Sequence, residues 1–432
     1  MKTEPMNKKL IAGGLIGNTL EWYDFAVYGY FAATIGHLFF PTENASASLL
    51  LSLSAFAVGF VSRPLGGILF GYIGDRMGRK AVLVYSTLMM AIPCTLIGLL
   101  PTWETIGIAA PVLLVLLRLL QGASVGGELT GSVSYLFEHA PPGRRALYAS
   151  FTIAGAISGI LLGSAVSTLI TAMLTPDQLL EWGWRIPFVM GAAVGIAGFV
   201  LRRHMPEDAP TTKQTEIRSP LITAVRSHWQ QMAIGSGIAI LIAVNFYMTF
   251  IYLTTYMVSV SGLEKTVSLE INTISMVVVL VMAVVGGWLA DRFGAHRVLI
   301  ACAVALIALA YPLLWMIDHP NFAMALSGQI GLALVIGPYN GVFAYYIGQL
   351  FPANIRMSGF SVCYNVSFAI FGGTAPMVAQ VLVSDVGPHA PAFYAMAAAA
   401  IGLISVVLSL RLNGEDQGVS TTVSSRQTTA RA

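Results

Sequence analysis

Long apolar runs, of about 18 residues or more, recur along almost the whole length of this 432-residue chain. A helix needs about 20 such residues to cross a hydrocarbon core of roughly 30 Å. Charged residues make up only 10% of the sequence, whereas an ordinary soluble domain carries about a quarter. Water is therefore not the main solvent, and the pattern predicts an all-α integral membrane protein and excludes a soluble globule.

Breaks at proline, glycine and charged clusters divide the sequence into about twelve expected transmembrane helices, in two sets of six. The first set lies near 9–39, 47–74, 81–100, 108–137, 145–172 and 183–202, and the second near 229–260, 266–292, 297–316, 322–350, 355–384 and 390–411. The longest polar segment separates the two sets. We predict an N-terminal half over 1–202, a cytoplasmic linker over 203–228, a C-terminal half over 229–411 and a disordered cytoplasmic tail over 412–432.

Basic residues fall in alternate loops between these spans. They are Lys8, Lys9, Arg76, Arg79, Lys80, Arg144, Arg145, Arg202, Arg203, Arg292, Arg297, Arg356 and Arg411. The opposite loops contain only Lys265 and Arg185, close to span ends. Because Lys and Arg are enriched on the cytoplasmic side of membrane proteins, we predict a multi-pass protein of the inner (plasma) membrane with both termini in the cytoplasm.

A loop sequence occurs twice at the same topological place. The block Gly71–Lys80, after the second span, recurs at Gly287–Arg297, after the eighth, with an offset of 216 residues. In the first copy, Asp75 can face the N-terminus of a neighbouring helix. Such a repeat indicates two halves that rock about a site at the membrane midplane, as in secondary transporters. We expect the two loops to form a cytoplasmic gate with Gly71, Asp75, Arg76, Arg79, Asp291 and Arg292.

Five charged residues lie deep in the expected spans, where each costs several kcal/mol unless it is paired or hydrated. They are Glu21, Asp24, Arg63, Arg118 and Glu128, all in the first half. Helical spacing gathers Asn18, Glu21, Asp24 and Tyr28 into one polar stripe on the first span, and Arg118, Gln121 and Glu128 share a face of the fourth. We expect these stripes to supply both proton-coupling and substrate-binding groups.

Asp24 and Arg118 are both expected near the midplane, and the simplest pairing joins them across a central cavity. A carboxylate beside an arginine stays ionised, whereas one freed from it in a low-dielectric medium binds a proton more readily. The pair therefore fits a proton switch, and the alternative is a static ion pair that holds two helices together. For Glu21 and Glu128, substrate contact, proton relay and structural pairing stay open. Arg63 precedes Pro64, and we favour a role at the inner end of the second span.

The second half contains no deep charge but several neutral polar and aromatic residues that could fix a ligand by hydrogen bonds and ring faces. The candidates are Asn245, Tyr247, Tyr339, Asn340 and Asn365. For any single one of them, packing between helices is the competing interpretation.

The duplicated loop resembles the signature loop of the major facilitator superfamily, whose fold has twelve helices in two pseudo-symmetric halves. More narrowly, Gly17–Phe25, Arg63–Gly67, Arg118–Glu128 and Glu181–Phe188 resemble the metabolite:proton symporter family. The resemblance implies proton symport of a solute such as citrate, a dicarboxylate, 2-oxoglutarate, shikimate, proline or betaine. It also places Asp24 and Arg118 at the positions of a known proton-coupling pair. The second loop departs from the pattern at Ala295 and His296, which puts its gating contacts in doubt.

These observations predict a secondary transporter that imports a small carboxylate-bearing metabolite, of the di- or tricarboxylate type, by proton symport. The alternative solute is an osmolyte such as proline or betaine, held by aromatic faces and Glu21, and a further alternative is a sensor that binds a solute without moving it. No P-loop, nucleotide fingerprint or hydrolase motif occurs, and the three cysteines lack metal-binding spacing. We therefore expect no enzyme activity, no cofactor or metal and no nucleic-acid partner. We expect the protein to function as a monomer in the lipid bilayer.

Overall fold

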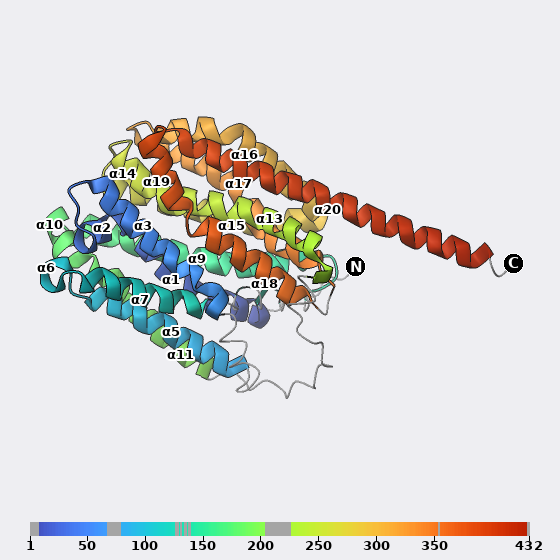
Figure 1. The fold of residues 1–432 in the computed structure, drawn as a ribbon, viewed down its shortest axis with the longest axis horizontal. Coiled ribbons are helices and arrows are strands. Elements are labelled where there is room, and N and C mark those ends of the chain that lie inside the picture. The colour runs from blue at the N-terminus through green and yellow to red at the C-terminus, as the bar shows by residue number, and fades with distance from the viewer. Residues whose placement is uncertain are drawn as a thin grey trace.

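The computed structural model describes residues 8–66, 79–125, 129, 132–133, 136, 140–203, 226–352 and 355–429. Its helices run side by side along one common axis, and short helices lie at one end of the bundle (Figure 1). Within these residues, eight helices are long and apolar enough to cross a membrane, and two shorter apolar helices accompany them. This all-helical arrangement is consistent with the twelve-helix fold predicted from the apolar runs.

The first part of the chain begins with α1 (Lys8–Tyr30), which is followed after one residue by α2 (Ala32–Phe39). The other elements of this part are α3 (Ala45–Val61), α5 (Arg79–Leu99), α6 (Trp103–Ile106), α7 (Ala109–Ser124), α9 (Arg145–Met173), α10 (Pro176–Gln178), the π-helix η1 (Leu179–Gly183) and α11 (Arg185–Arg203). The predicted linker falls largely on residues 204–225, which lie outside the described residues.

The second part begins with α13 (Trp229–Tyr247), which continues through a π-helical turn, η2 (Met248–Tyr252), into α14 (Leu253–Ser259). A second such turn, η3 (Phe368–Gly372), joins α18 (Arg356–Ser367) and α19 (Ala375–Asp385). The remaining helices are α15 (Lys265–Phe293), α16 (Ala295–Ile317), α17 (Phe322–Gln349) and α20 (Ala390–Thr429).

The last helix differs from the sequence prediction of a disordered tail. α20 continues through the polar segment after Arg411 to Thr429 and projects away from the bundle (Figure 1). No proline follows Arg411 to end the helix. Low hydrophobicity alone therefore did not locate the end of this helix.

Local signals account for several helix boundaries. Asn44 caps α3, because its side-chain oxygen accepts hydrogen bonds from the amides of Ser46 at 2.9 Å and Ala47 at 3.4 Å. Asn321 caps α17 in the same way through the amide of Met324. Gly294 separates α15 from α16 with φ at 97°, a conformation that residues with a Cβ rarely adopt.

Glycines allow several of these helices to approach one another closely. A Cβ added to Gly122 on α7 would lie 1.6 Å from the carbonyl oxygen of Gly59 on α3. At Gly159 on α9 it would lie 2.2 Å from the carbonyl oxygen of Thr19 on α1. The backbones therefore touch directly, which is the packing that small residues permit in membrane helices. This contact fixes α7, which carries Arg118 and Gln121, against α3.

We expect Gly122→Ala to lower the melting temperature of the purified protein, because neither backbone can yield to the added methyl group. Overpacking of this kind costs about 1–3 kcal/mol. Gly348→Ala in α17 is the matched control, since the nearest atom to its added Cβ is 4.0 Å away. Equal melting temperatures for the two variants would contradict the close α3–α7 contact.

Candidate functional site

The polar stripe expected on the first span is buried inside the bundle. The exposed fractions are 0% for Asn18, 6% for Glu21, 2% for Asp24 and 0% for Tyr28. Arg118 and Gln121 on α7 are also completely buried. The structure thus brings together the predicted groups of α1 and α7, whereas Glu128 lies outside the described residues.

Asp24 and Arg118 are joined mainly through Gln121. The closest direct approach of the two charged groups is 3.9 Å, between Arg118 Nη1 and Asp24 Oδ2. The same Arg118 Nη1 donates a hydrogen bond of 2.7 Å to Gln121 Oε1. Gln121 Nε2 in turn donates to Asp24 Oδ2. The pair predicted from the sequence therefore exists as a chain of three side chains, with a neutral amide in the middle.

Aromatic rings complete the surroundings of Arg118. Its guanidinium carbon lies 3.7 Å from the centre of the Tyr28 ring and 5.5 Å from that of Phe25. The Tyr28 hydroxyl donates to the backbone oxygen of Ser52 at 3.1 Å. Tyr28 therefore holds Arg118 through its ring face, and its hydroxyl is engaged with α3.

Arg63 lies two residues beyond the end of α3, and its role at the end of the second span stays a prediction. Its side chain is 0% exposed, and its guanidinium carbon lies 4.2 Å from the ring centre of Phe60, 5.1 Å from Phe25 and 5.3 Å from Trp22. Its three nitrogens form no salt bridge and no hydrogen bond of ordinary geometry with a described residue, and the nearby hydroxyls of Tyr247 and Tyr364 are the polar groups that interact with it. Arg63 is therefore a buried cation enclosed by rings. Phe25 touches both arginines.

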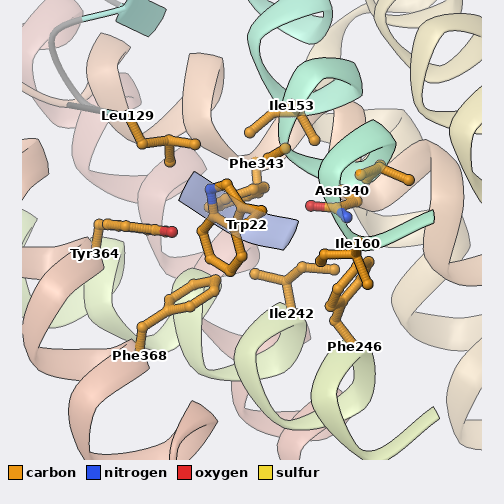
Figure 2. Close-up of a pocket in the computed structure, with 12 residues that line it drawn as sticks. Trp22, Leu129, Ile153, Ile160, Ile242, Phe246, Asn340, Phe343, Tyr364 and Phe368 are labelled. Carbon is orange, nitrogen blue, oxygen red and sulfur yellow. The ribbon is translucent and has the colours of Figure 1, made fainter. Parts of the chain in front are cut away.

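A small cavity lies between the first and second parts of the chain, next to this cluster. Figure 2 shows Trp22 among its lining residues, with the Tyr364 hydroxyl and the Asn340 amide directed toward it. The other lining residues are Leu129, Ile153, Ala156, Ile157, Ile160, Ile242, Phe246, Phe343 and Phe368. The free volume of about 30 Å³ holds a water molecule or two. A metabolite can enter only if the helices or side chains rearrange.

Tyr247 connects Arg63 to this cavity. Its ring centre is 5.1 Å from that of Phe60 and 6.4 Å from that of Trp22, and it also contacts Phe368 at 6.1 Å. Arg63 and Glu21 both act electrostatically on the hydroxyls of Tyr247 and Tyr364. The cavity, the rings and both charged residues therefore form one continuous site, which we call the aromatic site.

The other predicted residues of the second half are placed differently. Asn340 lines the cavity, but the Tyr339 hydroxyl donates to the backbone oxygen of Ile238 at 3.0 Å. Asn245 Nδ2 donates to the backbone oxygens of Leu241 and Ala395, which ties α13 to α20. Asn365 donates to Ser361 within its own helix. Substrate contacts by Tyr339, Asn245 and Asn365 stay predictions.

Sequence reasoning missed Arg63 and the rings of Trp22, Phe246, Phe343 and Phe368 as site residues. Apolar and aromatic residues are common throughout membrane helices, so their type alone does not separate cavity-facing from lipid-facing positions. The available signal was the accumulation of rings on α1 near three deep charges. Within the described ranges, no group of three His, Cys, Asp or Glu residues is placed to hold a metal ion.

At the opposite end from the short helices, Asp291 near the end of α15 contacts the start of α9. Its carboxylate oxygens accept hydrogen bonds from the amides of Ala146 at 3.0 Å and Leu147 at 2.9 Å. This is the contact with a helix N-terminus that the sequence suggested for the other copy of the loop. Arg292 lies 5.6 Å from the Trp288 ring centre. Gly71, Asp75, Arg76 and the side chain of Arg79 lie outside the described residues.

Neutral hydrogen bonds join α9 and α15 further along the same interface. Asn272 Nδ2 donates to Ser164 Oγ and to the Tyr30 hydroxyl, each at 3.1 Å. Thr273 shares hydrogen bonds with Ser164 at 2.8 Å and with Thr168 at 3.0 Å. The two parts of the chain are therefore linked by uncharged groups here.

Comparison with known families and curated proteins identifies transporters. Residues 11–210 match the family described as "Sugar (and other) transporter", and residues 264–430 match "Major Facilitator Superfamily". A proline/betaine transporter of Salmonella typhimurium is 34% identical over 412 residues, which are 92% of this chain and 82% of the relative. A glycine betaine/proline/ectoine/pipecolic acid transporter of Dickeya dadantii is 33% identical over 412 residues, with the same shares of the two chains.

Solved structures show the same fold at low sequence identity. A D-xylose-proton symporter superposes with a TM-score of 0.73 and 19% identity, covering 92% of this chain and 96% of the other. The inward-open xylose transporter XylE from E. coli gives a TM-score of 0.66 and 19% identity over 93% of this chain and 95% of its own. These similarities show the fold of the chain but do not identify the solute that it transports.

We expect Asp291→Ala to loosen the contact between α15 and α9, because two amides at the start of α9 lose their acceptor. Loss of such a cap costs about 0.5–2 kcal/mol. A cysteine introduced as Ser150→Cys, in a background without Cys94, Cys302 and Cys363, should then react several-fold faster with a thiol reagent. Asp291→Asn, which keeps one acceptor oxygen, should give an intermediate rate. An unchanged rate in Asp291→Ala would show that this contact does not close the interface.

Proposed function

Since this chain belongs to the major facilitator superfamily of membrane transporters, we propose that it imports a small zwitterionic osmolyte, such as betaine or proline, together with protons. It is a multi-pass membrane protein and a transporter of small molecules rather than an enzyme. The proposal concerns the solute, its coupling ion and the residues that bind them. The observation that carries it is the buried Arg63 inside the aromatic site.

Arg63 supplies the first half of zwitterion recognition. A buried guanidinium that forms no salt bridge with a described residue is costly, and a substrate carboxylate would provide two charge-assisted hydrogen bonds to it. The cavity-lining ring of Trp22 lies within 5.3 Å of this guanidinium carbon. A carboxylate bound to Arg63 would therefore keep the rest of a small solute next to the cavity.

The rings supply the second half. Trp22, Tyr364 and Phe368 line the cavity, and Tyr247 packs against Trp22 and Phe368. Faces of such rings attract quaternary and secondary ammonium groups by cation–π interaction. Glu21 acts on the hydroxyls of Tyr247 and Tyr364 and adds negative charge at the same place. The site therefore offers a cation for a carboxylate and ring faces for an ammonium.

This charge balance favours the osmolyte over the di- or tricarboxylate that was our main sequence prediction. Arg118 is already engaged by Gln121 and Asp24, which leaves Arg63 as the cation of the aromatic site. A di- or tricarboxylate would bring two or three negative charges next to Glu21 with one arginine to meet them. The curated relatives are named as proline/betaine transporters, in agreement with the alternative solute class.

Asp24 is the proposed proton carrier. It is buried, it lies in one chain of contacts with Gln121 and Arg118, and Phe25 connects Arg118 to Arg63. Proton binding at Asp24 would neutralise the charge that holds Arg118 and so change the packing of α1 against α7. Entry of proton and solute together would then favour the rearrangement that releases both on the other side. We further propose a monomer in the inner membrane, with both termini in the cytoplasm.

The substrate proposal is tested by adding glycine betaine, proline or citrate to the purified protein and measuring the melting temperature, which rises when a ligand binds the folded state. We expect stabilisation by betaine or proline and a loss of affinity of about 10- to 100-fold in Arg63→Met, the size of one or two charge-assisted hydrogen bonds. Arg185→Met is the control, because Arg185 bonds backbone oxygens of Gly98 and Leu100 away from the aromatic site. Stabilisation by citrate alone would restore the organic-acid alternative.

The coupling proposal is tested by Asp24→Asn in proteoliposomes. We expect this variant to exchange labelled glycine betaine across the membrane but not to accumulate it under an inward proton gradient, because its amide binds no extra proton. Accumulation equal to that of the unsubstituted protein would rule out Asp24 as the proton carrier. Loss of both exchange and binding would indicate a structural ion pair instead.

A further inference from the structure

We infer that Gln121 is a positioning residue that transmits the protonation of Asp24 to Arg118 by reversing its side-chain amide. The inference rests on the proposed role of Asp24 as proton carrier. Gln121 and Arg118 lie one helical turn apart on α7, and both side chains are 0% exposed.

The distances assign the link to the amide rather than to the direct ion pair. Charge-assisted hydrogen bonds between nitrogen and a carboxylate oxygen measure about 2.7–2.9 Å. The direct approach of Arg118 Nη1 to Asp24 Oδ2 is 3.9 Å, whereas the bond from Nη1 to Gln121 Oε1 is 2.7 Å. The second contact of the amide, from Nε2 to Asp24 Oδ2, is also a hydrogen bond. The amide therefore carries the stronger connection.

The polarity of this chain fits an ionised Asp24, and among protonated forms it fits only one with the proton on Oδ1, which has no hydrogen-bond partner among the described residues. An ionised carboxylate only accepts hydrogen bonds, a guanidinium only donates them, and an amide has one end of each kind. A proton on Oδ2 would face the Nε2 donor. Half a turn of the amide would let Oε1 accept from the Asp24 hydroxyl, but it would turn Nε2 toward the Arg118 donor. Arg118 would thus lose its acceptor when Asp24 gains a proton on Oδ2.

The other groups around Asp24 do not provide this link. Arg118 on α7, Cys94 on α5 and the neighbouring Tyr23 on α1 are the titratable groups that act on it. Cys94 Sγ interacts with Asp24 and donates to the backbone oxygen of Phe188 at 3.4 Å, and the Tyr23 hydroxyl donates to that of Pro187 at 2.8 Å, both on α11. Arg63, just beyond the end of α3, lies across the ring of Phe25, and Glu21 lies on α1. Gln121 alone contacts both Asp24 and Arg118 through hydrogen bonds among these groups.

The test compares Gln121→Met and Gln121→Glu in the full-length protein. In proteoliposomes supplied with glycine betaine, we expect Gln121→Met to flatten the dependence of uptake on external pH and to reduce accumulation at least about tenfold. Equilibrium binding of betaine should change less than about threefold, since Gln121 lies outside the aromatic site. In Gln121→Glu, two carboxylates share one arginine and one proton. Half-maximal uptake should therefore move to a higher pH.

Gln380→Met is the matched control for removal of a buried amide. Gln380 on α19 accepts a hydrogen bond from the Tyr252 hydroxyl at 2.9 Å and has no contact with Asp24. We expect this variant to keep the pH profile of the unsubstituted protein even if its melting temperature falls. The comparison separates a loss of stability, common to both amide deletions, from a loss of proton coupling.

Infrared difference spectra of the solute-free protein between acid and neutral pH provide a readout that needs no substrate. The band of the protonated Asp24 carboxyl is identified by its disappearance in Asp24→Asn, and we expect a different frequency for it in Gln121→Met. An unchanged band together with an unchanged pH profile in Gln121→Met and Gln121→Glu would overturn the inference. Persistent accumulation in Asp24→Asn would instead overturn the proposed proton carrier, and absence of betaine binding would overturn the proposed solute.

Discussion

The burial of charge in a medium of low dielectric is the constraint on which the arrangement of this protein depends. Arg63 and Arg118 are completely buried, and Asp24 is nearly so. Each charge would cost several kcal/mol without compensation. Among the described residues, Arg118 is compensated by an amide, a carboxylate and a ring, but Arg63 by rings and the hydroxyls of Tyr247 and Tyr364. Arg118 therefore has a carboxylate close by and Arg63 forms no salt bridge with a described residue, and Phe25 lies between the two arginines.

Much of the fold could be predicted from the sequence, because runs of apolar residues and their breaks report directly on helices in a membrane. The stripe on α1 and its partner face on α7 followed from helical spacing, and both proved buried. The bridging position of Gln121 did not follow, since spacing cannot tell a contact of 3.9 Å from a hydrogen bond of 2.7 Å. The rings of α1 and α3 around Arg63 did not follow either, since its neighbour Pro64 reports only on the helix end.

The interface between α9 and α15 contrasts with these charged groups. Its hydrogen bonds connect Ser164 and Thr168 with Asn272 and Thr273, all of them neutral. Hydrogen bonds of this kind between membrane helices contribute only about 0.6 kcal/mol each on average. They can therefore be exchanged for others during a rearrangement at little cost. The single carboxylate contact, from Asp291 to the start of α9, lies at one end of this interface.

Three of the long helices are interrupted along their length. α1 and α2 are separated at Phe31, and the 216-residue offset of the duplicated loop carries Phe31 onto Tyr247, directly before η2. η3 interrupts the passage from α18 to α19, and its first residue, Phe368, lines the cavity. A π-helical turn holds one residue more than an α-helical turn and loosens the hydrogen-bond ladder locally. The short segments α2, α14 and α19 can therefore tilt while the longer parts of the same helices keep their packing. Opening one side of the cavity then need not disturb the packing on its other side.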